Sequence, residues 1–166
     1  MTFNRFLAVL AGMVIGLSLL GGVQPVSALT VAQQARCDLA TTRIDLLITR
    51  YSNNKDRHVE RYVSARNKII TLVEKLEGKG YDVTKITTDL KTWDGMIKKM
   101  STDYNIFVDS LNLTKQYTCA QSQGDFKTQL KDAQSKLATV KQSSLDTRLF
   151  YQQTIRTDIE ELKSQK

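Results

Sequence analysis

Residues 83–111, VTKITTDLKTWDGMIKKMSTDYNIFVDSL, decide the fold. Their apolar side chains recur at alternating steps of three and four residues, at Val83, Ile86, Leu90, Trp93, Ile97, Met100, Tyr104, Phe107 and Leu111. This spacing places all of them on one side of an α-helix, and it is the a/d pattern of a coiled coil. The stretch therefore predicts a long helix whose apolar row packs against other helices.

The rest of the chain holds few residues that interrupt helices. Pro25 is the only proline of the 166 residues, and half of the eight glycines precede residue 29. A β protein would need many more turns. Two turns stand out, at residues 78–80 (Gly-Lys-Gly) and 122–125 (Ser-Gln-Gly-Asp). The sequence predicts an all-α fold, an elongated antiparallel three-helix coiled-coil bundle with helices over about 31–77, 82–119 and 125–163.

The two flanking segments follow the same spacing, each with one irregularity. In the first segment the heptad frame shifts by four residues near Ser52-Asn53-Asn54-Lys55. Such a shift predicts a locally unwound helix, and a true break is the alternative. The shifted frame then predicts that Leu72 and Leu76 lie on the buried side. In the third segment the apolar row softens around residues 144–147 and resumes at Tyr151.

Residues 1–28 have the pattern of a signal peptide. Arg5 gives a positive start, Phe6 to Val23 is an uncharged apolar run, and Val26-Ser27-Ala28 supplies small residues at a cleavage site. Cleavage after Ala28 leaves a single helical domain at 29–166. An uncleaved anchor is the alternative, because the apolar run is just long enough to span a bilayer. Both readings place the domain outside the cytoplasm, as a secreted, periplasmic or cell-surface protein, and any membrane contact is made through this segment.

Export changes the interpretation of the two cysteines. Cys37 and Cys119 both follow the predicted signal peptide, and disulfides persist in oxidising compartments. The two cysteines lie at similar distances in sequence on either side of the turn at 78–80, so folding there brings them level. We therefore predict an intramolecular Cys37–Cys119 disulfide.

A row of basic residues runs along the first helix. Arg36, Arg43, Arg50 and Arg57 are spaced by seven residues, and Arg61, Lys68 and Lys75 continue the row after the frame shift. An antiparallel hairpin is expected to set Lys75 beside Asp82 and Lys68 beside Asp89 as exposed ion pairs. The four arginines at 36–57 lack obvious acidic partners on the second helix. They are candidates for binding an anionic surface polymer or an acidic envelope protein, or else they form a solvated helix flank.

The sequence contains no recognisable catalytic motif. His58 is the only histidine. Without a second histidine, no Cys/His or Ser/His nucleophile motif can be assembled. Its position on the apolar side favours a polar residue at the core boundary, with a ligand or pH switch as the alternative. No metal or cofactor site is expected. The aromatic residues lie in the apolar rows rather than along the basic row, which does not support specific nucleic-acid recognition.

Several features of the chain resemble a group of small exported helical proteins of candidate-phyla (Patescibacteria-type) bacteria: the signal peptide, Cys37, Tyr51, His58, Tyr62, Gly80-Tyr81-Asp82, Asp103-Tyr104, Phe107, Cys119 and Phe150-Tyr151. This resemblance implies export and a helical fold, and no activity. In size, charge and helical hairpin the chain also resembles cationic periplasmic chaperones of the OmpH/Skp type.

These observations predict a non-enzymatic interaction or structural protein of the cell envelope. The formal net charge of +7 agrees with an anionic or acidic partner. The alternative is a holdase-type periplasmic chaperone with an apolar helical cradle. The sequence leaves the oligomeric state open.

Overall fold

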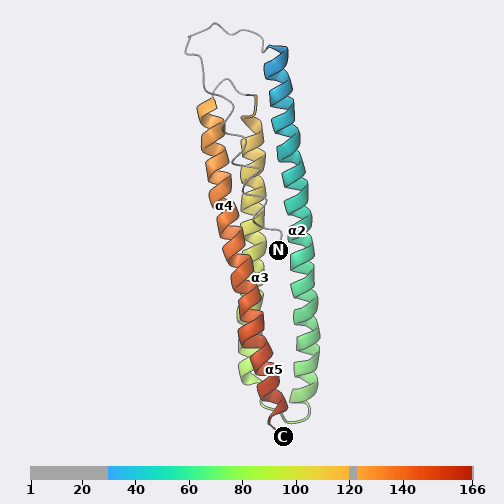
Figure 1. The fold of residues 1–166 in the computed structure, drawn as a ribbon. Helices are drawn as coiled ribbons and strands as arrows, with labels where there is room; N and C mark the ends of the chain where they lie inside the picture. Colours follow the sequence, from blue (N-terminus) through green and yellow to red (C-terminus); the bar gives the residue numbers. More distant parts are fainter. Residues whose placement is uncertain (1–29, 120–122, 166) are drawn as a thin grey trace. The chain divides into compact units, whose positions relative to one another are not determined.

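The structure is a computed structural model that describes residues 30–119 and 123–165 (Figure 1). The predicted signal peptide, residues 1–28, lies outside the described residues. All regular structure in the described part is helical, and its order is α2 (Val31–Glu77), α3 (Thr84–Gln116), α4 (Gln123–Phe150), the π-helical turn η1 (Tyr151–Ile155) and α5 (Arg156–Lys163). None of these helices combines the length and the apolar character that a membrane crossing requires.

The helix bounds follow the sequence pattern closely. α2 covers the predicted 31–77 and runs without a break through residues 52–55. α3 begins at Thr84, two residues later than predicted, because the carboxylate of Asp82 accepts a hydrogen bond of 3.0 Å from the Thr84 backbone N–H ahead of the helix. Gly80 has a φ of +84°, which favours glycine, and it ends the turn between the two helices.

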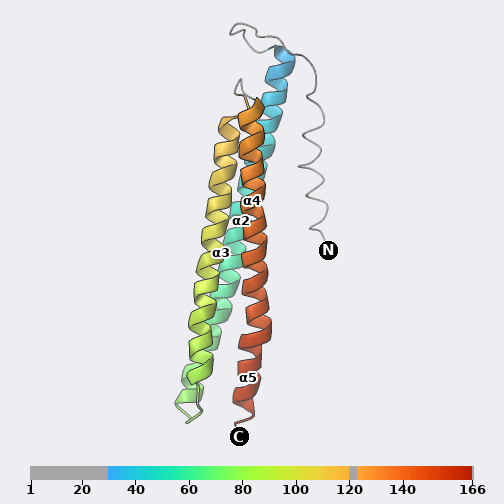
Figure 2. The same cartoon turned by 90° about the vertical axis from the view of Figure 1, so that its left-hand side faces the viewer.

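α3 is the helix on which the others pack. Its apolar row is buried from end to end: Val83 just before it, then Ile86, Leu90, Trp93, Ile97, Met100, Tyr104, Phe107 and Leu111. α2 and α4 both contact α3, but no Cα atom of α2 comes within 8 Å of one of α4 in the described part. Figures 1 and 2 show the three long helices side by side. The prediction of three mutually packed helices is confirmed, with α3 as the shared partner.

Contacts between α2 and α3 define how the chain folds back at residues 78–80. Near the start of α2, the Thr41 and Thr118 hydroxyls are 2.8 Å apart. Further along, Asp45 pairs with Lys115 at 2.6 Å and Arg66 pairs with Asp94 at 3.1 Å. Residue numbers therefore rise along α2 as they fall along α3.

The third segment is nearly continuous, but it changes pitch at η1. The softened row before η1 buries Ser143 and Thr147 in place of apolar residues. The Thr147 hydroxyl donates to the Ser143 carbonyl, and the Thr147 carbonyl accepts the indole N–H of Trp93 at 3.1 Å. A π-helical turn inserts one residue into the helix and so rotates the residues beyond it. Ile155 and Leu162 then lie in the core.

One predicted core residue is wrong. Leu72 was expected on the buried side of α2, but 41% of its surface is exposed, and Val73 is buried instead. The buried positions here are Ile69, Val73 and, partly, Leu76. The spacing between them is four residues and then three, whereas the predicted frame has three residues and then four. Leu72 is thereby turned about 100° away from Val73.

The neighbours Phe107 and Ile106 provide a matched test of this core. Phe107 is 3% exposed and Ile106 is 45% exposed. Phe107→Ala should lower the free energy of unfolding by about 3–5 kcal/mol, because it leaves a cavity between α3 and its neighbours. Ile106→Ala should cost less than about 1 kcal/mol. Urea denaturation of both variants measures the difference, and equal losses would contradict the burial of this row.

Candidate functional site

The four arginines of the predicted binding row all lie on the surface of α2. Arg36, Arg43, Arg50 and Arg57 are exposed. Arg57 donates to the side-chain carbonyl of Asn54 on its own helix. Arg36 and Arg43 have no side-chain partner among residues 30–119 and 123–165. Arg36 and Arg43 therefore stand on α2 as exposed charges that no described side chain of α3 neutralises.

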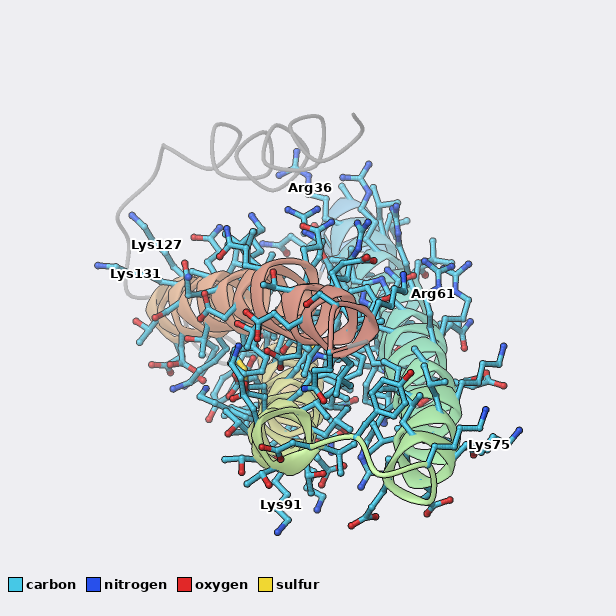
Figure 3. The ribbon with its side chains drawn as sticks, turned by 90° about the horizontal axis from the view of Figure 1, so that it is seen from below. Arg36, Arg61, Lys75, Lys91, Lys127 and Lys131 are labelled. Carbon is cyan, nitrogen blue, oxygen red and sulfur yellow. The ribbon has the colours of Figure 1, made fainter. Side chains whose placement is uncertain are left out.

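The predicted ion pairs between this row and α3 are wrong. Asp82 binds the Thr84 backbone N–H, and its own backbone N–H donates to Gln165. Asp89 lies beside Asp158 of α5 instead of Lys68. The helices are joined through the other edge of α2, where Arg66 pairs with Asp94. Arg66 follows Arg61 by five residues, which places it about 140° around the helix. Figure 3 shows Arg61 and Lys75 pointing outward from α2, away from α3.

Half-buried aromatic residues follow three of the basic residues directly. Arg50, Arg57 and Arg61 precede Tyr51, His58 and Tyr62. Each ring packs on α3: Tyr51 lies 4.7 Å from Phe107 and Tyr62 lies 5.8 Å from Trp93, both edge to face, while a hydrogen bond of 3.0 Å joins Nδ1 of His58 to the Tyr104 hydroxyl. The sequence interpretation separated the aromatic residues from the basic row, but consecutive residues are only about 100° apart on a helix. The two sets therefore adjoin along one strip.

The charges of the row reach these rings. Burial lowers the pKa of His58, and the positive charges of Arg61 and Arg57 lower it further. Burial raises the pKa of Tyr62, while Arg148 of α4 and Arg61 of α2 act in the opposite direction. Burial also raises the pKa of Tyr51, and the positive charge of Arg50 opposes this rise. His58 is thus a neutral boundary residue near pH 7, and Tyr62 has arginines from two helices beside it.

The two cysteines lie together at the far end of the α2–α3 hairpin. Both are free thiols in the structure, so the predicted disulfide is not formed there. Cys37 is buried and donates to the Thr118 carbonyl at 3.3 Å, whereas Cys119 is exposed. Interaction with the Cys119 thiol and then burial raise the pKa of Cys37 to about 11.

A carboxylate cluster that the sequence pattern did not reveal attaches α5 to α3. Asp158 is 2% exposed and pairs with Lys85 at 2.8 Å, and Lys85 also contacts Glu161 at 2.7 Å. Burial, and then a hydrogen bond with Asp158, raises the pKa of Asp89. The two carboxylates raise the pKa of Lys85. The turn η1 brings Asp158 to α3, and no feature of the heptad spacing indicated that shift.

Neither a metal site nor a similar known protein indicates the function of the described part of the chain. Within residues 30–119 and 123–165, no group of three or more His, Cys, Asp or Glu side chains is placed to hold a metal ion. No protein-family model, curated protein or solved structure matches the chain. The surface feature with the clearest capacity for binding is therefore the basic row of α2 and the aromatic residues beside it.

Proposed function

We propose that the chain is an exported, non-enzymatic interaction protein of the cell envelope that binds an acidic protein or an anionic surface polymer through the basic row of α2. One observation carries this proposal. Arg36 and Arg43 are exposed and have no side-chain partner among the described residues, although acidic residues of α3 pair with other cations. Positive charge left unneutralised on one flank attracts anionic partners.

The alternative, a holdase-type chaperone, requires an open apolar cradle. The longest apolar row of the chain belongs to α3, and it is covered: Trp93, Met100 and Phe107 are each 3% exposed or less. Two of the exposed apolar residues of α2, Leu39 and Leu46, lie in sequence between Arg36 and Arg50. These features favour a charge-directed interaction protein over the chaperone.

The proposal includes an antiparallel coiled-coil architecture and a disulfide formed after export. Opposite residue order in the α2–α3 contacts and the nearly unbroken a/d spacing of α3 support the architecture. The interaction of the two thiols at the same end of the α2–α3 hairpin supports the disulfide, because disulfides form and persist in the oxidising envelope.

Mass spectrometry tests the disulfide directly. Native protein purified from the envelope and digested without reductant should yield one cross-linked peptide pair containing Cys37 and Cys119. Its mass should disappear in a Cys119→Ser variant. Two free thiols in the wild-type protein would contradict the disulfide.

Replacing the four arginines tests the binding row. Arg36→Gln/Arg43→Gln/Arg50→Gln/Arg57→Gln should abolish retention of the protein on its own envelope material. The melting temperature should change little, because exposed charges contribute about 0.2–1 kcal/mol each at most. Retention of the wild type in a pull-down should fall steeply as added salt screens the charges.

Four exposed lysines elsewhere supply the matched control. Lys91, Lys127 and Lys131 point into solvent in Figure 3, and Lys79 in the turn after α2 is exposed as well. Replacement of these four lysines by glutamine removes the same net charge. This control should remain bound at low salt. Equal retention of the wild type and the arginine variant would remove the basic row from the account.

A further inference from the structure

Three arginine–aromatic pairs follow one another along α2 and form a continuous strip. The strip consists of Arg50-Tyr51, Arg57-His58 and Arg61-Tyr62. From Arg50 to Tyr62 it spans 12 residue steps, which is about 18 Å or a little over three helical turns. In each pair the basic residue is exposed and the aromatic ring is half-buried. Three of the turns of α2 in this stretch thus offer a cation with an aromatic surface beside it.

The strip borders α4 as well as α2. Thr147, next to Arg148 on α4, accepts the indole N–H of Trp93, and the Trp93 ring packs on Tyr62. Arg148 therefore lies near the same aromatic residue as Arg61, and both charges oppose the rise in the pKa of Tyr62. Neither Arg61 nor Arg148 has an acidic partner among the described residues. Both α2 and α4 pack on α3, their Cα atoms stay more than 8 Å apart in the described part, and the three aromatic rings of the strip are only half-buried.

We propose that this strip, together with Arg148 of α4, binds an acidic amphipathic helix of a partner protein, which packs along α2 and α4 as a fourth helix. The proposal rests on the proposed function and names its partner class. An amphipathic helix can place apolar side chains on Tyr51 and Tyr62 while acidic residues on its flanks meet the arginines. The separation of seven between Arg50 and Arg57 matches the repeat of flanking positions in such a helix.

Charge and shape favour this occupant over others. A second copy of the chain would bring arginines against arginines along the same strip, which is repulsive. A flat bilayer needs protruding apolar side chains, whereas the three rings of the strip are held against α3 by Phe107, Tyr104 and Trp93. A simple anionic polymer would use the arginines and leave the aromatic surfaces without a partner.

Two labelled synthetic peptides of four heptads provide the probe. Both carry Leu at positions a and d; one has Glu and the other has Lys at positions e and g. Like charges at these flanks keep each peptide from pairing with itself. Fluorescence anisotropy with the purified full-length chain should show salt-sensitive binding of the Glu peptide and at least about tenfold weaker binding of the Lys peptide.

Variants at the two helices place the site. Arg61→Gln/Arg148→Gln should weaken binding of the Glu peptide by about tenfold or more, whereas Lys91→Gln/Lys131→Gln, with the same loss of charge, should change it less than about threefold. The reversal Arg61→Glu/Arg148→Glu should transfer preference to the Lys peptide. A gain of binding of this kind cannot arise from unfolding.

Other outcomes overturn the inference and separate it from the proposed function. Unchanged binding of the Glu peptide to Arg61→Gln/Arg148→Gln would overturn it, as would equal binding of both peptides by the wild type. Binding of phosphatidylglycerol vesicles or of polyphosphate, but not of the Glu peptide, would also overturn the acidic-helix partner. The proposed function would stand in each case if the variant at Arg36, Arg43, Arg50 and Arg57 still lost envelope retention.

Discussion

The buried row of α3 is the constraint on which the rest of the molecule depends. Trp93 and Met100 have no exposed surface, and both α2 and α4 pack their apolar faces against this helix. Burial of apolar surface supplies the main favourable free energy of such a bundle. Because one helix serves two partners, α2 and α4 are held in place without packing closely on each other.

This arrangement determines which polar residues are consumed by the fold and which stay available. At one edge of α2, Arg66 and Asp45 are paired with α3. At the foot of the bundle, Lys85 neutralises Asp158, which would otherwise be a buried unpaired charge. The opposite edge of α2 carries exposed arginines beside aromatic rings that the fold covers only in part, and two of them, Arg36 and Arg43, have no side-chain partner in the described part. A surface of this composition is suited to binding, and the proposed partner follows from it.

The sequence predicts the helices well because their signals are local. The a/d spacing of residues 83–111 and the glycine at position 80 specify α3 and the turn before it. Finer features escaped prediction where two segments distant in sequence meet. Lys68 and Lys75 did not pair with Asp89 and Asp82, since the angular position of each side chain depends on the frame shift in α2. The sequence pattern does not reveal the strip of arginines and aromatic residues, because it places the aromatic residues on the apolar side of α2 and the arginines on the basic flank, although consecutive residues are only about 100° apart.

Native-state hydrogen exchange tests the central place of α3 most directly. If both neighbours depend on this helix, amides around Trp93–Phe107 should exchange slowest, through global unfolding of the chain. Amides at the ends of α2 and α4 should open earlier, in smaller local fluctuations. Protection of α2 or α4 that equals or exceeds that of α3 along its whole length would contradict the account.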